Sequence, residues 1–253
     1  SHVVGAIQRA LFKVEEEWGP LTPAEQMVLK VVELTEVDRF VGPPQRGWRG
    51  RPELDRRPIA RAFIAMKVLN LQSRTALLDR LHSSPALRRL CGWERRTEIP
   101  AEATLSRVFR QFAEGELADR VHEALIARAY EDRLVGHVSR DSTAIHARER
   151  ATNRNRGQKK PKERPSRLER QAGGMTLVQM LNDLPDGCDH GCKRNSRGKL
   201  ENWRGYKLHI DWGDGEVPLS CILTSASVHG SQVAIPLATI TQARVVSLYD
   251  LMD

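Results

Sequence analysis

The sequence predicts an α+β (or α/β) protein of two domains: an all-helical domain over residues 1–134 and a mixed β-sheet with helices over residues 135–253. In the first part the apolar residues recur with the period of an amphipathic helix. In the second part they occur in short runs rich in Val, Ile and Thr, which are typical of strands. A chain of 253 residues can bury two modest cores, so we interpret the change in pattern near residue 135 as a domain boundary.

The first domain is predicted to begin with a series of short helices. Thr22 and Pro23 suit the N-cap and the first position of a helix that extends to about residue 40. Pro58 opens a second helix after a loop rich in Gly, Pro and Arg. Two further helices are expected to begin at Ser73 and Ser84.

The segment 99–112 predicts a helix with one basic face, which Thr104 would cap. Its apolar stripe should face the core and consists of Leu105, Val108, Phe109 and Phe112. Arg107 and Arg110 should point outward. This pattern is typical of the recognition helix of a helix-turn-helix, and equally of an ordinary amphipathic helix with a solvated basic face. A last helix over residues 117–134 is expected to close the domain.

Asp141 is the most informative residue of the second domain, because it is a carboxylate near the end of a strand-like run. The residues that favour an extended, half-buried backbone there are Val135, Val138, Thr143 and Ile145. An acid at such a position must bind a metal or a cation, or titrate. The alternative interpretation is a structural ion pair with Arg140 or Arg148.

A basic insertion is predicted over about residues 148–200. Between Arg148 and Arg170 the chain contains ten Lys and Arg and few apolar residues. Such a segment cannot bury enough apolar surface to order itself, so we expect residues 148–197 to be mobile without a ligand. The insertion is either a solvated linker or an arm that becomes ordered on nucleic acid. Its candidate DNA contacts are Arg154, Arg156, Lys159 and Lys160.

The remaining sequence predicts a hairpin, a helix and a strand. Residues 206–212 and 217–224 read as antiparallel strands joined by a turn at 213–215. Ser231 should cap a helix, and residues 243–251 supply another apolar strand-like run. The predicted order is therefore strand, insertion, strand, strand, helix, strand.

Charge and composition narrow the class of protein. The net charge of +8 suits a polyanionic partner such as nucleic acid. No run of 18 apolar residues exists and Glu15–Glu17 stand where a signal peptide would need an apolar core, so we expect a cytoplasmic protein without membrane contact. Four cysteines in so long a chain do not make a disulfide framework. A weaker hypothesis is a zinc site formed by Cys188, His190, Cys192 and His209.

Three stretches of the chain resemble the bacterial insertion-sequence transposases of the DDE, RNase H-like superfamily. They are residues 139–143 (SRDST), residues 195–198 (NSRG) with 203–209 (WRGYKLH), and residues 223–232 (LTSASVHGSQ). The resemblance covers most of the chain. It implies an N-terminal helical domain that binds transposon-end DNA, followed by a partial RNase H-like catalytic domain.

The resemblance also implies a catalytic triad of two aspartates and a glutamate that holds two Mg²⁺ (or Mn²⁺) ions. Asp141 matches the first acid, and Asp253 is favoured as the second, with Asp250 as the alternative. The third acid should lie on a later helix, so we expect a chain truncated before it and inactive by itself. Further implications are double-stranded DNA as the partner, both transposon ends and target, a homodimer for the full-length protein, and a nucleoid-associated location in a bacterium. The alternative is a non-catalytic DNA-binding remnant of a transposase.

Overall fold

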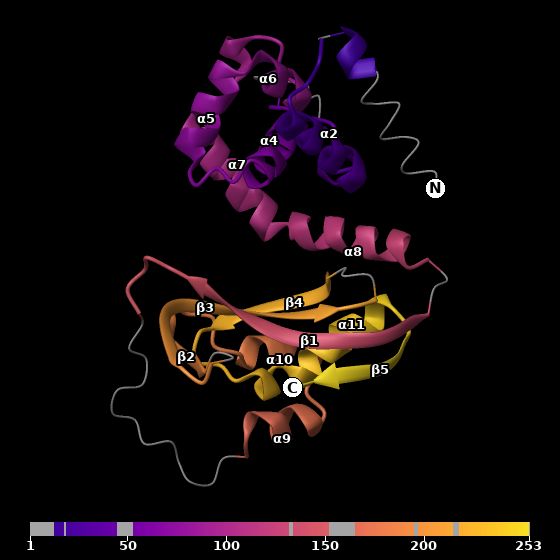
Figure 1. Ribbon diagram of the computed structural model, residues 1–253, viewed down its shortest axis with the longest axis vertical. Helices are drawn as coiled ribbons and strands as arrows, with labels where there is room; N and C mark the ends of the chain where they lie inside the picture. Colours follow the sequence, from indigo (N-terminus) through magenta and orange to yellow (C-terminus); the bar gives the residue numbers. More distant parts are fainter. Residues whose placement is uncertain are drawn as a thin grey trace. The chain divides into compact units, whose positions relative to one another are not determined.

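The computed structural model of the protein describes residues 13–17, 19–44, 53–131, 134–151, 165–194, 197–214 and 218–252. The chain divides into two compact units, Ser1–Leu125 and Ile126–Asp253 (Figure 1). A helical part is followed by a mixed five-stranded sheet with helices, which confirms the predicted fold class.

The helical part begins as the local sequence predicts. Its elements are α2 (Pro23–Thr35), α3 (Asp38–Val41), α4 (Arg57–Val68), α5 (Arg74–Ser83), α6 (Pro85–Cys91), the 3₁₀ helix η1 (Arg96–Glu98), α7 (Glu102–Glu114) and α8 (Leu117–Ala129). Thr22 caps α2 in a capping box with Glu25, and the hydroxyls of Ser73 and Ser84 accept from the first turns of α5 and α6. The main core of this unit is built around Ile59, Leu77, Leu81 and Leu105, which are fully buried.

Four details of the helical unit differ from the prediction. The last helix, α8, ends at Ala129 and not at residue 134. Glu36 has a left-handed backbone (φ 46°), so the first long helix ends at Thr35 and α3 forms separately. Ala101 occupies the N-cap of α7, which begins two residues before Thr104 and has no side-chain cap. Phe109 is 51% exposed, although its position in the apolar stripe predicts burial.

The second unit is a mixed sheet with helices. Its strands are β1 (Val135–His146), β2 (Asp189–Arg194), β3 (Leu200–Trp212), β4 (Pro218–Ser225) and β5 (Ser247–Met252). The strand order is β2-β3-β1-β5. β4 also pairs with β3, on the edge opposite to β1. β1 pairs with β3 antiparallel and with β5 parallel, so β1 is a central strand.

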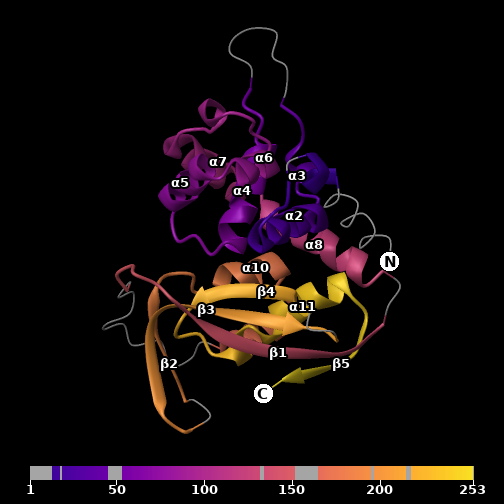
Figure 2. The same ribbon diagram turned by 45° about the horizontal axis from the view of Figure 1, so that its top comes forward.

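In the described part of this unit the strands are accompanied by α9 (Arg167–Ala172), α10 (Leu177–Asp183), the short 3₁₀ helix η2 (Gly230–Gln232) and α11 (Ala234–Arg244). Figure 2 shows α10 and α11 beside β3 and β4. The core between α11 and the sheet contains Ile222, Val233 and Leu237, together with Leu184 from the insertion. The order of β1, insertion, β3, β4, α11 and β5 agrees with the predicted order.

The prediction that the whole insertion lacks structure is wrong for residues 165–194, which form α9, α10 and β2. Capping boxes begin both helices, at Ser166 and Thr176. Met180, Leu184 and Cys188 are buried, so this part of the insertion does contribute to a core. Arg154, Arg156, Lys159 and Lys160, the candidate DNA contacts, lie outside the described residues.

Candidate functional site

Asp141 lies on β1, between β3 and β5. It pairs with Ile210 of β3, and its side chain is exposed. One carboxylate oxygen, Oδ1, accepts a hydrogen bond from the backbone N–H of Ser142 at 2.6 Å. Among the described residues no ion pair involves Asp141, so the alternative of a structural pair with Arg140 or Arg148 is wrong. The carboxylate is open to solvent and to a ligand.

Arg140, the residue before Asp141, points to the opposite face of the sheet and binds Asp211 of β3. Its guanidinium donates to both carboxylate oxygens at 2.7 Å, and the side chains of Arg140 and Asp211 are only 9% and 0% exposed. The Thr241 hydroxyl of α11 donates to Oδ2 of Asp211 at 2.6 Å, and Ser220 bonds the same hydroxyl at 2.6 Å. Because a carboxylate only accepts, Thr241 must donate to it and Ser220 must donate to Thr241.

This buried cluster fixes β1 against β3 and α11. It lies on the face of the sheet opposite to the side chain of Asp141, at the neighbouring position of β1. The cluster was not predicted from the sequence. The one signal available was an acid, Asp211, between the apolar residues Ile210 and Trp212 of the strand, and its partner Arg140 is 71 residues away in the chain.

The parallel pairing of β1 with β5 separates the two candidates for the second acid. Asp250 pairs with Val138, three positions before Asp141. Since successive side chains of a strand point to opposite faces, Asp250 and Asp141 project from opposite faces of the sheet. Asp253 lies outside the described residues, and the described register ends at the pair Arg140–Met252, one position before Asp141 and Asp253.

The predicted zinc set is not brought together. Cys188 is buried and bonds the carbonyl of Glu149, and His209 is buried against the Thr224 hydroxyl at 3.0 Å. His190 and Cys192 are exposed on β2. Within the described parts of the chain, no three His, Cys, Asp or Glu residues are grouped as metal ligands.

His209 makes the stability of the second unit (residues 126–253, here called the α/β unit) depend on pH. Burial lowers the pKa of its imidazole from 6.5 to about 4, helped by the nearby charges of Lys207 and His229. Between these two values the unfolded chain binds a proton that the folded chain does not, so stability is complete above pH 6.5 and falls as the pH drops toward 4. We expect denaturation curves to show this loss and a His209→Gln variant to show a smaller one. An equal loss in both proteins would contradict the assignment.

In the helical unit, Arg107 and Arg110 are exposed on α7, as predicted. Arg107 donates to the Thr104 hydroxyl at 3.2 Å, one turn earlier in the helix. The connection from α6 to α7 runs over residues 92–101 and contains η1. It is longer than the three- or four-residue turn of a helix-turn-helix, so α7 presents a basic face without that compact motif.

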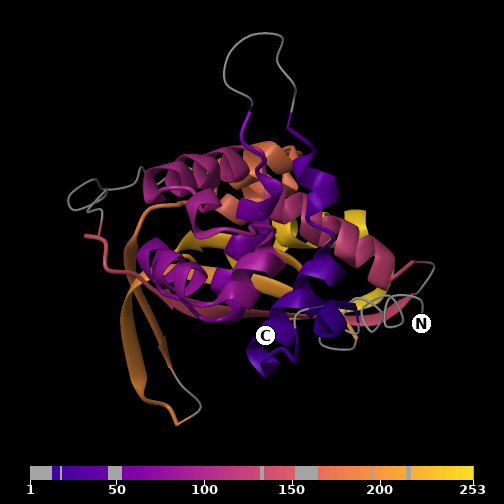
Figure 3. The ribbon, with the colours of Figure 1, turned by 90° about the horizontal axis from the view of Figure 1, so that it is seen from above.

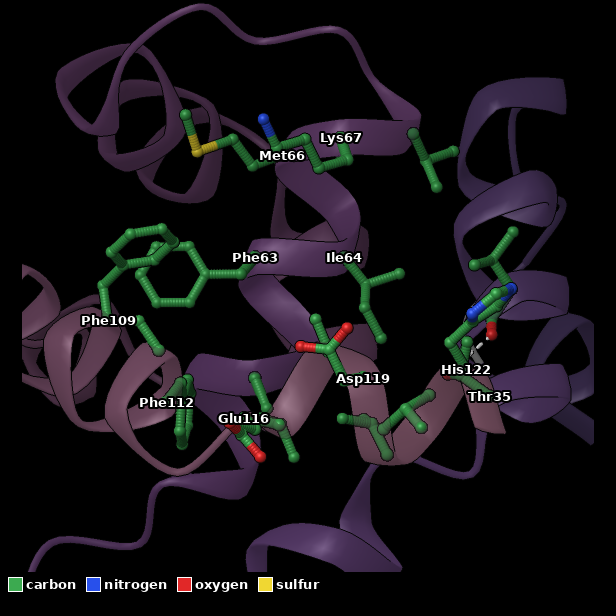
Figure 4. Close-up of a pocket in the computed structure, with 18 of the residues that line it drawn as sticks. Thr35, Phe63, Ile64, Met66, Lys67, Phe109, Phe112, Glu116, Asp119 and His122 are labelled. Carbon is green, nitrogen blue, oxygen red and sulfur yellow. Dashed lines mark hydrogen bonds between the residues drawn. The ribbon is translucent and has the colours of Figure 1, made fainter. Parts of the chain in front are cut away.

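An apolar pocket of about 600 Å³ lies among α2, α4, α7 and α8 (Figure 4). Phe63, Phe109 and Phe112 gather on one side of it, and the ring of Phe109 meets that of Phe63 edge-on with centroids 5.2 Å apart. Phe109 therefore forms part of the pocket wall, which explains why it is exposed on the apolar side of α7. Lys67, Glu116 and Asp119 also line the pocket.

Comparison with known families finds a match within the helical unit. Residues 17–111 match the model of a family described as Transposase domain (DUF772). The matched segment runs through α2 to α6 and most of α7, and the chain thus carries a transposase-related domain. No curated protein and no solved structure matches the chain. No helix among the described residues is both long and apolar enough to span a membrane.

Proposed function

We propose that the chain is part of a DNA transposase of the DDE, RNase H-like type. Its role would be to bind transposon-end DNA and, in the full-length form, to cleave and join DNA strands with the help of divalent metal. The observation that carries the proposal is the transposase domain at residues 17–111, joined in one chain to a mixed sheet whose central strand exposes Asp141.

Asp141 and Asp253 are the acids that we propose to hold the metal ions. The exposed carboxylate of Asp141 fits Mg²⁺ or Mn²⁺ in kind, since these ions prefer hard oxygen ligands. The parallel register supports Asp253 as its partner, because the last described pair directly precedes both acids. Two such ions, when bound, supply activation of the attacking oxygen and stabilisation of the leaving oxygen. The role of β1 is to hold Asp141 in place, with the Arg140–Asp211 pair fixing the strand from the other face.

Double-stranded DNA is the proposed partner, through α7 and the basic insertion. Arg107 and Arg110 present two exposed cations on one helix, and Arg154, Arg156, Lys159 and Lys160 would add contacts from the insertion. A homodimer of the full-length protein also belongs to this proposal.

DNA binding should be sensitive to salt and should depend on α7. Each phosphate contact contributes about 0.9 to the slope of log K against log salt, so Arg107→Ala with Arg110→Ala should lower the slope by about 1.8. Fluorescence anisotropy with duplex DNA from the transposon ends would measure this slope. Lys30→Ala, an exposed cation on α2, is the control and should leave the slope unchanged. An unchanged slope in the α7 variant, with circular dichroism showing an intact fold, would limit α7 to a packing role.

A second candidate function is a DNA-binding remnant without catalysis. It is favoured by the finding that no three metal-binding side chains are grouped within the described ranges. Both candidates predict DNA binding, and only the transposase predicts DNA cleavage that requires Mg²⁺ or Mn²⁺. A cleavage assay with the complete gene product and the DNA ends that flank its gene separates them.

A further inference from the structure

The β2–β3 ribbon extends beyond the rest of the sheet, as Figure 3 shows. β3 pairs with β1 from Gly205 onward and with β4 from Tyr206 onward. Its first residues, Leu200 to Arg204, pair with β2, and the carbonyl of Arg204 also accepts the backbone N–H of Ala147, just after β1. Residues 189–206 contain five Lys or Arg and two Asp or Glu. A projecting, positively charged pair of strands is thus part of the α/β unit.

The two faces of this ribbon differ in chemistry. One face, here called the ribbon face, carries three cross-strand pairs that are all exposed: His190–Arg204, Cys192–Asn202 and Arg194–Leu200. It combines two arginines with hydrogen-bonding side chains and contains no acid. Both acids of the ribbon, Asp189 and Glu201, belong to pairs on the other face.

The other face is braced by Trp203. Its indole lies across Gly191, where an added Cβ would come within 2.4 Å of the ring, and its Nε1–H donates to the carbonyl of Tyr206 at 2.9 Å. The ammonium of Lys207 lies 5.5 Å from the ring centroid. Trp203 is only 6% exposed, although it stands where the ribbon leaves the sheet. The indole therefore stiffens a two-stranded element that is only marginally stable in isolation.

The base of the ribbon is also anchored. The Ser227 hydroxyl donates to a carboxylate oxygen of Asp189 at 2.7 Å, and the Ser225 hydroxyl bonds the carbonyl of Gly187 at 2.5 Å. Asp189 is thus engaged at the base, on the face opposite to the exposed Arg194 and Arg204. Little further ordering is needed for a ligand to bind there, which favours affinity.

We propose that the ribbon face binds double-stranded DNA, with Arg194 and Arg204 on phosphates and Asn202 and His190 within reach of hydrogen-bonding groups. The major groove of B-DNA admits a two-stranded β-ribbon, and arginine binds phosphate through several N–H donors. This inference rests on the proposed function, which makes DNA the partner. It adds a DNA contact on the α/β unit that is separate from α7 and from residues 154–160.

The test compares neighbouring cations on opposite faces. Arg194→Ala with Arg204→Ala should lower the slope of log K against log salt by about 1.8 on duplex DNA. Lys193→Ala removes a cation from the other face and should leave the slope unchanged. The variants should retain the circular dichroism spectrum of the parent, because all three side chains are exposed.

Cys192 provides an independent readout, because it lies on the ribbon face between the two arginines. Cys91 and Cys188 are buried, so a Cys221→Ser background leaves Cys192 as the exposed thiol for alkylation. Saturating duplex DNA should slow alkylation of Cys192 in proportion to the fraction bound, and should not do so in the Arg194→Ala, Arg204→Ala variant. The ribbon inference is wrong if the parent binds duplex DNA, its Cys192 is not protected, and the Arg194→Ala, Arg204→Ala variant shows an unchanged salt slope. The proposed function would stand in that case. If the chain binds no duplex at low salt, DNA binding itself fails and both are overturned.

Discussion

Asp141→Asn is expected to abolish metal-dependent DNA cleavage by the complete gene product and to leave DNA binding and folding unchanged. The amide has nearly the shape of the carboxylate but lacks its charge, so it is a poor ligand for Mg²⁺ or Mn²⁺. Misplacing reacting groups by about 1 Å can cost on the order of a hundredfold in rate, and we expect at least that loss. The fold should tolerate the change because the side chain is exposed and, among the described residues, bonds the neighbouring N–H of Ser142 alone.

The matched control for this experiment is Asp250→Asn. Asp250 is also an exposed acid near the β1–β5 pairing, but it projects from the opposite face of the sheet. Cleavage should survive in this variant. Activity that persists in Asp141→Asn, or that disappears in Asp250→Asn alone, would refute the assignment of Asp141.

Arg140→Met is expected to be the most destabilising single change in the sheet. It leaves the carboxylate of Asp211 buried without its cation, and breaking a buried pair in this way typically costs about 3–5 kcal/mol. The double variant Arg140→Met with Asp211→Leu should recover most of the loss, because the apolar side chains need no partner and Ser220 can still bond Thr241. Hydrogen exchange in β1 and β3 measures the effect without contributions from the helical unit.

Arg170→Met is a control for Arg140→Met within the same unit. Arg170 pairs with Asp183 near the surface, and Arg167 remains bound to the same carboxylate. Such partly exposed pairs contribute about 1 kcal/mol or less. Equal losses in the Arg140 and Arg170 variants would show that the Arg140–Asp211 pair does not hold β1.

The starts of α2, α5 and α6 were predictable because their causes are local. Thr22, Ser73 and Ser84 each accept from a backbone N–H three residues later, so the signal lies within one turn. The strand that carries Asp141 was predictable for a similar reason, since a short run of β-branched residues marks it. The predicted cap at Ser231 is wrong, because Ser231 lies within η2 and α11 begins at Ala234 without a side-chain cap.

The structure of the insertion was not predictable from its composition. The segment is highly charged, and its few apolar residues pack against residues that are distant in the sequence. Leu184 packs with Val233, the residue before α11, and with Leu237 of α11, about fifty residues later in the chain. The Arg140–Asp211 pair was not predicted for the same cause, because the two residues are 71 positions apart and nothing near either one in the sequence indicates the other. The role of Asp253 stays a prediction, because it lies outside the described residues.

β3 is a single strand that pairs with β2 through its first residues and with β1 and β4 through the rest, and this continuity has a geometric consequence. Gly205, with φ 148° and with the Ile145 carbonyl where a Cβ would stand, is the last residue of β3 that pairs with β2 and the first that pairs with β1, on the opposite edge. From Arg204 to Ile210, the residue beside Asp141, the strand advances about 20 Å at 3.3 Å per residue. In the proposed complex, a duplex bound at Arg204 would therefore lie at a distance from Asp141 that the length of β3 fixes.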